Sequence, residues 1–179
     1  MAILDSGDRT QFDTGAVRDM RAGKGRCDLM PLDTVATSLV YMCGGEEKEI
    51  TLDGYGRVYK SDVLGRIAKF QDGGYASDLH EALDIFCAFA YDGCHPTMLL
   101  EAAKHFEDGA AKYGDNNWRK GIPVRFYIDS AVRHYLKWLR GDSDEPHDRA
   151  FVWNIMCADW TCEHKPKLNG YREESSENA

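Results

Sequence analysis

The sequence predicts an all-α protein, namely an antiparallel helical bundle with a small inserted hairpin-like segment and an extended N-terminal arm. Three observations predict this fold class. Apolar residues recur at three- and four-residue spacing over the second half of the chain, as on the faces of packed helices. Prolines and glycines stand where these segments begin and end, at Pro123 and Pro146 and at Gly114 and Gly141. One short segment shows the two-residue alternation of paired strands.

The expected elements follow in chain order. Residues 1–30, rich in glycine and arginine, form the arm, and residues 31–164 form the helical domain. Within this domain 46–76 is expected to be an irregular insertion, with a hairpin where EITL, DGYG and RVYK follow one another. Helices are expected at Leu32–Met42, Ser77–Tyr91, Thr97–Tyr113, Pro123–Arg140 and Asp144–His164. The polar tail, 165–179, is expected to be disordered.

Composition limits the class of protein. The 179 residues are 43% hydrophobic, which is enough for one domain with a sizeable core. The net charge of −8 argues against a binder of duplex nucleic acid, which normally presents a basic face. The sequence starts without a secretion signal, and no apolar run is long enough to span a membrane. The six cysteines include no C-x-x-C pair, so we expect reduced thiols and a cytoplasmic location, the host cytoplasm if the chain is phage-encoded.

The most informative polar residues lie on the last three expected helices. On the first of these, the apolar stripe is expected to include Leu99, Ala103 and Phe106, and Glu107 borders it. Small alanines around this carboxylate leave room for a metal ion or a phosphate. The alternative is an acid at the edge of the stripe that reaches solvent.

The next helix carries Asp129 and Arg133 one turn apart, and His134 on its apolar face. Asp129 could hold a cation and Arg133 a phosphate, because a guanidinium matches two phosphate oxygens at once. The alternative is a surface ion pair, which would contribute little stability. His134 is expected to be buried or half-buried.

The last helix places His147 and Asn154 on one face, and Asp148 in the first turn, where the helix dipole favours an acid. An asparagine among apolar neighbours must find hydrogen-bond partners. The alternative is a simple N-terminal acid and a satisfied core asparagine.

Basic segments flank these helices. The loop KYGDNNWRKG and the arm together offer six side chains that suit the phosphates and the base of a nucleotide. These are Arg18, Lys24, Arg26, Lys112, Trp118 and Lys120. The GKG of the arm is not a Walker loop, since neither Ser nor Thr follows the lysine. By composition alone the arm is a solvated basic tail.

Taken together, the motifs resemble those of the phage and bacterial dATP/dGTP diphosphohydrolase family, N-terminal domain. The resemblance rests on TGAVRDMRAGKGRCDLMP at 14–31, HFEDGAAKYGDNNWRKGIP at 105–123 and YIDSAVRHYLKWLRGDSDEPHDRAFVWN at 127–154. It implies hydrolysis of a purine deoxynucleoside triphosphate, dGTP or dATP, to the monophosphate and pyrophosphate. It also implies that the arm clamps the triphosphate and that the protein is a homo-oligomer. The chain departs from other helical pyrophosphohydrolases in lacking their E-x-x-E and E-x-x-D pairs on these helices.

Under this hypothesis Glu107, Asp129 and Asp148 hold one or more Mg²⁺ or Mn²⁺ ions, which lower the pKa of a water that attacks the α-phosphorus. His134 or His147 serves as a proton carrier or as an additional ligand.

The other predicted site residues act on the nucleotide. Arg133 and the lysines and arginines of the loop and arm neutralise charge that develops on the phosphates. Trp118 and Asn154 contact the base or the sugar.

Two alternatives stay open. An HD-type phosphohydrolase would use His105 or His134, then His147 with Asp148, and Asp159. A non-catalytic module would bind nucleotides or a host protein through the same residues without turnover.

Overall fold

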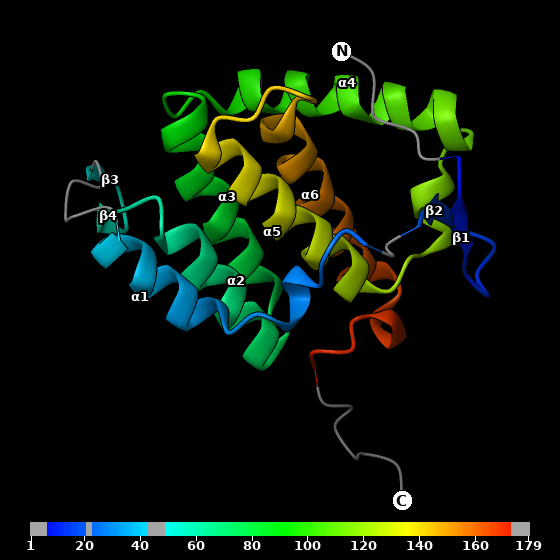
Figure 1. Cartoon of the computed structure of the whole chain (residues 1–179), viewed down its shortest axis with the longest axis horizontal. Coiled ribbons are helices and arrows are strands. Elements are labelled where there is room, and N and C mark those ends of the chain that lie inside the picture. The colour runs from blue at the N-terminus through cyan, green and yellow to red at the C-terminus, as the bar shows by residue number, and fades with distance from the viewer. Residues whose placement is uncertain (1–6, 21–22, 43–48, 173–179) are drawn as a thin grey trace, which may run out of the picture.

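The computed structural model describes residues 7–20, 23–42 and 49–172. Within them the chain forms six α-helices and two short antiparallel hairpins (Figure 1). The predicted all-α class is therefore confirmed. The two hairpins lie at opposite ends of the long axis of the molecule.

Five helices lie close to their predicted positions. They are α1 (Leu32–Met42), α3 (Ala76–Ala90), α4 (His95–Tyr113), α5 (Val124–Arg140) and α6 (His147–His164). Their ends follow from local sequence. Pro96 lies in the first turn of α4, and Pro123 directly precedes α5. Gly141 ends α5 in the left-handed conformation, with φ 82°, and its N–H bonds to the carbonyls of the last turn.

The core is built around α5 and α6, which pack against each other, while α4 and α3 pack on α6. Phe86 of α3, Tyr135 of α5 and Phe151 of α6 are fully buried, with ring centroids 4.4 to 6.0 Å apart. Burying one such side chain stabilises the fold by roughly 2 kcal/mol. This aromatic cluster therefore fixes the helices that carry the polar site residues.

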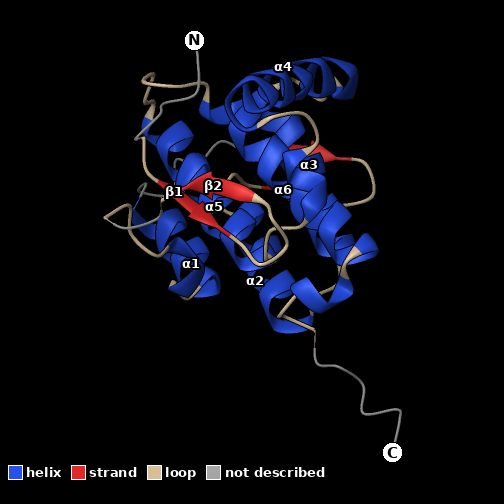
Figure 2. Ribbon diagram, turned by 90° about the vertical axis from the view of Figure 1, so that its right-hand side faces the viewer, coloured by secondary structure: helices blue, strands red, loops and turns tan. Residues whose placement is uncertain are grey.

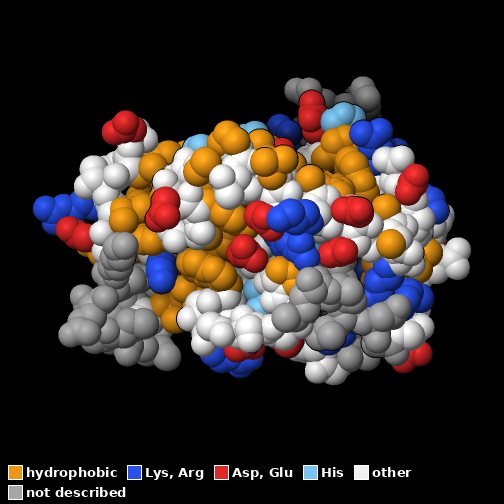
Figure 3. All heavy atoms as spheres, turned by 90° about the horizontal axis from the view of Figure 1, so that it is seen from above, with side chains coloured by type: hydrophobic (Ala, Val, Ile, Leu, Met, Phe, Trp, Pro, Cys, Tyr) orange, Lys and Arg blue, Asp and Glu red, His pale blue; other side chains and the backbone are white. Residues whose placement is uncertain are grey.

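The buried face of α4 differs from the predicted stripe. Met98, Ala102 and His105 are buried, whereas Leu99 is 49% exposed and Ala103 is exposed. Each buried residue precedes the predicted one by a single position. Apolar residues occur on two adjacent faces of α4, and periodicity alone does not say which of these faces packs against α6. The face seen from above α4 accordingly mixes hydrophobic and charged side chains (Figure 3).

The N-terminal arm is folded where the structure describes it. Strands β1 (Arg9–Gln11) and β2 (Val17–Asp19) form an antiparallel hairpin, and Cys27–Leu29 forms a turn of 3-10 helix, η1. The prediction of an extended arm is wrong for these residues. Hydrogen bonds to residues about 100 positions away hold them, and local sequence patterns do not contain such contacts.

The insertion at 46–76 is only partly as predicted. Strands β3 (Ile50–Leu52) and β4 (Gly56–Val58) pair and confirm the hairpin. The irregular remainder is a wrong prediction, because Asp62–Gly73 forms helix α2, which buries Leu64, Ile67 and Phe70 against the bundle. Residues 46–48 lie outside the described residues.

The first part of the tail is also ordered. A 3-10 turn, η3, covers Pro166–Leu168, and buried Asn169 donates to the Gly74 carbonyl at 3.2 Å. Gly74 ends α2 with φ 67°, and a Cβ there would lie 2.8 Å from the backbone nitrogen of Arg172. The prediction of disorder is therefore wrong for 165–172, and 173–179 lies outside the described residues.

None of the described helices is long and apolar enough to cross a membrane.

Candidate functional site

A cavity of about 700 Å³ lies between the β1–β2 hairpin, the second half of α4, the loop after α4, and helices α5 and α6. We call it the central cavity. The hairpin lies on the outside of the helical bundle (Figure 2) and supplies Val17, Arg18 and Asp19 to the lining. The cavity therefore has one wall from the N-terminal arm and the others from the helices that carry the sequence motifs.

Arg18, on β2, carries a charge that no carboxylate of the described residues pairs with. Its Nη2 donates to Oδ1 of Asn154 at 2.6 Å, and the guanidinium lies 5.2 Å from the ring centroid of Tyr127. Its Nη1 is shielded from solvent and has no hydrogen-bond partner within the described part of the chain. Burial lowers the pKa of Arg18, yet an arginine stays charged in proteins. A buried cation without a carboxylate is costly, so this position favours an anionic ligand.

The loop after α4 holds the hairpin through Asn117. The Val17 N–H donates to Oδ1 of Asn117 at 3.0 Å, and Nδ2 of Asn117 donates to the Val17 carbonyl at 2.8 Å. The hydroxyl of Thr14 donates to the Gly121 carbonyl. The asparagine side chain thus pairs with β2 as a neighbouring strand would.

Asp19 ties the other side of β2 to the end of α4. Its carboxylate accepts from Arg9 at 2.9 Å and from Lys112 at 2.8 Å. Since Arg18 lies between the two anchored residues Val17 and Asp19, both sets of contacts orient its guanidinium toward α6.

Aromatic side chains form a second wall of the central cavity. Those that line it are Phe106, Tyr113, Trp118, Phe126 and Trp153. Phe106 meets Trp118 and Trp153 edge to face, with centroids 5.4 and 5.9 Å apart. Such a wall offers planar apolar surface of the kind that a nucleobase contacts.

Asp129 and Arg133 tether the N-terminal segment to α5. Asp129 is 1% exposed, accepts from the Cys27 N–H at 2.7 Å and pairs with Arg133. Arg133 donates from Nε to the Lys24 carbonyl at 3.0 Å and from Nη2 to the Gly25 carbonyl at 3.3 Å. The predicted surface pair is wrong, since Asp129 is buried. The pair is directed at backbone groups in this structure, and its predicted contacts with a cation and a phosphate stay predictions.

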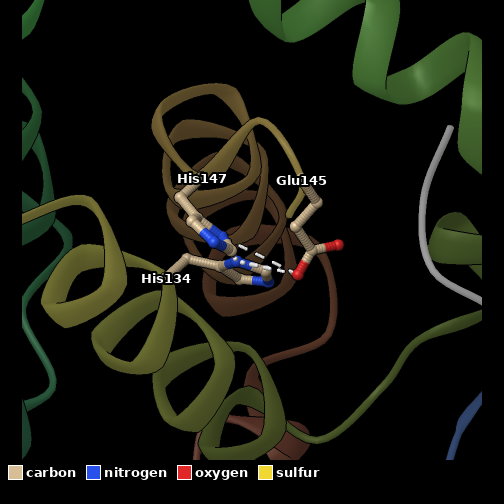
Figure 4. A group of neighbouring side chains, drawn as sticks. All are labelled: His134, Glu145 and His147. Carbon is tan, nitrogen blue, oxygen red and sulfur yellow. Dashed lines mark hydrogen bonds and ion pairs between the residues drawn. The ribbon is translucent and has the colours of Figure 1, made fainter. Parts of the chain in front are cut away.

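Two imidazoles and a carboxylate meet at the edge of the central cavity (Figure 4). Nδ1 of His134 lies 3.0 Å from Nδ1 of His147, and Oε1 of Glu145 lies 3.6 and 3.7 Å from these two atoms. Nε2 of His147 contacts Oδ1 of Asp144 at 2.7 Å. Burial, and then the neighbouring His147, hold the pKa of His134 well below its usual range. His134 is therefore a neutral imidazole at neutral pH.

The structure brings most of the predicted site residues together. Those that line the central cavity are Arg18, Lys24, Glu107, Trp118, Asp129, Arg133, His134 and Asn154. The others, which do not line it, are Arg26, Lys112, Lys120, His147 and Asp148.

Ion pairs, solvent or neighbouring side chains surround Arg26, Lys112, Lys120 and His147 outside the cavity, and Asp148 is described with the other carboxylates below. Arg26 donates twice to Asp28, at 2.7 Å each, and Lys112 pairs with Asp19. Lys120 is exposed, and His147 is buried behind His134. Ion pairs or solvent engage the charges of Arg26, Lys112 and Lys120 in this structure, and their contact with the nucleotide stays a prediction.

The carboxylates predicted to bind a metal do not converge. Asp148 accepts a hydrogen bond from the Tyr91 hydroxyl at 2.9 Å. Asp129 is bonded to the Cys27 N–H and to Arg133, and Glu107 is an exposed side chain of the cavity wall. Among the described residues, the groups of three potential ligands with atoms within 4.8 Å are His134–Glu145–His147 and Asp142–Asp144–His147. Neither contains Glu107, Asp129 or Asp148, so the structure does not bring the predicted ligand set together.

The HD-type alternative is not assembled either. Asp159 pairs with His80 at 3.0 Å, and Asp148 bonds to Tyr91. Other side chains thus engage both carboxylates that such a centre needs.

The main sequence-based hypothesis left out three residues that shape the cavity, although the HD-type alternative named His105. Asn117 anchors the hairpin, Glu145 faces the two imidazoles, and His105 is 6% exposed with no partner for Nδ1 in the described part of the chain. Burial lowers the pKa of His105 to about 4. The sequence DEPH held a usable signal for Glu145, because a carboxylate and an imidazole two residues apart flank a proline at a helix start.

Residues 85–170 match the family model described as dATP/dGTP diphosphohydrolase, N-terminal. The predicted family resemblance is confirmed. The matched segment contains α4, α5 and α6 and therefore most of the cavity wall, whereas the β1–β2 hairpin precedes it. Neither a curated protein nor a solved structure matches the chain. The family name points to hydrolysis of dATP or dGTP.

Proposed function

We propose that the central cavity binds a purine deoxynucleoside triphosphate, dGTP or dATP, and that the protein hydrolyses it to the monophosphate and pyrophosphate. The observation that carries this proposal is Arg18, a half-buried cation at the cavity without a carboxylate partner in the described residues. The family match over α4 to α6 supports the nature of the ligand.

The phosphates would lie against the hairpin side of the cavity. Arg18 lies there, held by Asn154, and Lys24 stands exposed at the rim. Charge-assisted hydrogen bonds from arginine and lysine to phosphate oxygens are among the stronger polar contacts in proteins. The ligand anion would then compensate the charge of Arg18, which the described residues leave without a carboxylate.

The base would lie against the aromatic wall. Phe106, Trp118 and Trp153 present ring edges and faces there, and the cavity volume is within the roughly 300–1,000 Å³ of small-molecule sites. Purines, with the larger ring system, bury more apolar surface on such a wall than pyrimidines do.

In the proposed reaction the oxygen of a water forms a bond to the α-phosphorus. The bond from this phosphorus to the α–β bridging oxygen breaks, and pyrophosphate leaves with that oxygen while the water gives up a proton. The products are a nucleoside monophosphate and pyrophosphate. A divalent cation, Mg²⁺ or Mn²⁺ in our sequence-based prediction, would neutralise charge on the phosphates when bound. Glu107, Asp129 and Asp148 do not form a site that fits such an ion, so we assign it no step.

The test is a substrate screen on the full chain. Purified protein is incubated with dGTP, dATP, GTP, ATP, dCTP or dTTP and with Mg²⁺ or Mn²⁺, and products are resolved by ion-exchange chromatography. We expect dGMP or dAMP with an equal amount of pyrophosphate. Release of tripolyphosphate or of inorganic phosphate as the first product would contradict the proposal.

A variant separates binding from chemistry. Arg18→Met should lose nucleotide binding and turnover together, while Arg57→Met on β4, whose side chain is 75% exposed, should keep both. Stabilisation of the parental protein by dGTP in a thermal shift, with no product over hours, would indicate the non-catalytic module instead.

The remaining predictions concern assembly. We propose that the protein is a homo-oligomer and acts in the cytoplasm without a nucleic-acid partner. Analytical ultracentrifugation measures the oligomeric state. A single sedimenting species at the monomer mass of 20.2 kDa would contradict the proposal of a homo-oligomer.

A further inference from the structure

The group formed by His134, Glu145 and His147 lies where α5 approaches the start of α6 (Figure 4). We infer that these three side chains bind one divalent transition-metal ion at the edge of the central cavity. The binding of the ion rests on the geometry described next, whereas a role for it in hydrolysis rests on the proposed function.

The three donor atoms are spaced as metal ligands are. Nδ1 of His134, Nδ1 of His147 and Oε1 of Glu145 form a triangle with edges of 3.0, 3.6 and 3.7 Å. The point equidistant from three such atoms lies about 2.0 Å from each, and zinc bonds to imidazole nitrogen and to carboxylate oxygen measure about 2.0–2.2 Å. The three side chains therefore need little movement to bind an ion.

Asp144 prepares one of the imidazoles for binding. Its Oδ1 lies 2.7 Å from Nε2 of His147, so this nitrogen carries the proton and Nδ1 carries the lone pair. That lone pair accepts the hydrogen bond from Nδ1 of His134 in the metal-free protein, and a bound ion would take the place of the proton between the two nitrogens. A carboxylate behind a histidine ligand is the usual second contact of metal-binding imidazoles, because it fixes the ring and its tautomer.

The two imidazoles satisfy each other through the hydrogen bond between their Nδ1 atoms, whereas the carboxylate of the group is left without a cation in the described part of the chain. The side chain of Glu145 is 11% exposed and that of His147 is 1% exposed. Within the described part of the chain the salt bridges of Glu145 are to the two histidines, and neither lysine nor arginine pairs with it. A shielded carboxylate facing imidazoles at more than 3.5 Å is an arrangement that a cation would stabilise.

The other candidate group is a weaker site. Asp142, Asp144 and His147 also lie within reach of one another. Arg140 pairs with Asp142, and Lys137 pairs with Asp144 at 2.8 Å, so both carboxylates already have cations. Asp144 therefore serves better as support for His147 than as a ligand.

The ligand types indicate the class of ion. Two imidazoles and one carboxylate suit Zn²⁺, Mn²⁺, Fe²⁺ or Co²⁺, whereas Mg²⁺ and Ca²⁺ prefer oxygen ligands throughout. His134 and Glu145 line the central cavity, so a bound ion would have protein on one side and the cavity on the other. An ion there would polarise a water or a phosphate oxygen of the nucleotide.

The test measures metal binding without substrate. The full chain is stripped with a chelator and dialysed, and Zn²⁺, Co²⁺ and Mg²⁺ are then titrated separately by calorimetry. We expect one equivalent of Zn²⁺ or Co²⁺ to bind, with at least roughly 100-fold weaker binding of Mg²⁺. Visible absorption of the Co²⁺ form reports on imidazole ligation. Failure of both ions to reach one equivalent overturns the inference.

Variants locate the site. Glu145→Gln and His134→Asn should each weaken Zn²⁺ binding at least 100-fold, and Asp144→Asn should weaken it roughly 10- to 100-fold. His80→Asn is the matched control, because His80 also contacts a carboxylate, Asp159, but is 60% exposed. Circular dichroism of the stripped variants checks folding. Binding by Glu145→Gln at parental affinity overturns the inference, as does a His80→Asn variant that loses the ion.

The outcomes also separate this inference from the proposed function. If the parental chain binds one ion through these residues but hydrolyses no nucleotide, the metal site stands and the proposed function fails. If the chain hydrolyses dGTP while Glu145→Gln binds Zn²⁺ as the parent does, the proposed function stands and the metal site fails.

Discussion

Asn154 of α6 accepts a hydrogen bond from Nη2 of Arg18 at 2.6 Å, and its own amide donates to the Ala150 carbonyl at 2.8 Å. The second bond fixes which end of the Asn154 amide faces the cavity. Only the oxygen is then available to Arg18. A neutral acceptor orients this guanidinium without cancelling its charge, which leaves the charge for an anionic ligand.

Asn154→Asp tests this relationship directly. A carboxylate at the same position would pair with Arg18 and compete with the phosphates, so nucleotide affinity should fall at least roughly 10-fold while stability is kept or raised. Calorimetry with dGTP and thermal denaturation measure the two effects. Asn154→Leu should instead lower stability by about 1–3 kcal/mol, since a buried donor loses its acceptor. Unchanged dGTP affinity in Asn154→Asp would show that Arg18 does not contact the ligand.

Arg18→Met should move stability and binding in opposite directions. Replacing this half-buried cation, which lacks a carboxylate partner in the described residues, by an apolar side chain of similar length should be neutral or stabilising, by up to about 2 kcal/mol. Nucleotide binding should be lost. Urea denaturation and a dGTP titration measure the pair of effects, and a strong loss of stability with intact binding would make Arg18 a purely structural residue.

Asn117→Ala should release the β1–β2 hairpin from the helices. The variant loses both bonds to Val17, and we expect a loss of about 1–3 kcal/mol together with a raised KM for dGTP. Hydrogen exchange should show faster exchange at 9–19 and little change in α6. Arg57→Met is the control, because Arg57 lies on β4 away from the central cavity and its side chain is 75% exposed.

Asp129→Asn should act on stability and not on metal content. Removing this charge leaves Arg133 without its carboxylate, which should cost about 3 kcal/mol or more. The double variant Asp129→Asn, Arg133→Met should recover part of that loss, as a double-mutant cycle would quantify. Atomic emission analysis should find the same metal content in Asp129→Asn as in the parent. A selective loss of metal would restore Asp129 as a ligand.

Acid should destabilise the protein partly through His105. Burial holds the pKa of His105 at about 4 in the folded state, against about 6.5 in the unfolded chain. Between these values the unfolded chain binds a proton that the folded protein excludes. The stability contributed by neutral His105 is therefore complete above pH 6.5 and is lost as the pH falls toward 4, by up to about 3 kcal/mol. His105→Gln should show a shallower fall in unfolding free energy over this window, and an equal slope would refute the assignment.

The sequence by itself determined the helices and their order. Periodicity located α3 to α6 to within a few residues, and glycine and proline marked their ends, because helix formation and termination depend on residues within one or two turns. The long motifs at 105–123 and 127–154 also pointed to the family that matches 85–170. Both kinds of information are local in the chain.

The tertiary structure decided which polar residues meet. Arg18 reaches Asn154 across 136 positions, and Asp129 bonds to the backbone of Cys27, so a residue that looked like a metal ligand proved to be a tether. Glu145 attracted no attention in sequence, yet it faces His134 and His147. Such pairings depend on the rotation of each helix about its axis and on where the hairpin packs. Burial of the whole core sets both, and no short stretch of sequence encodes them.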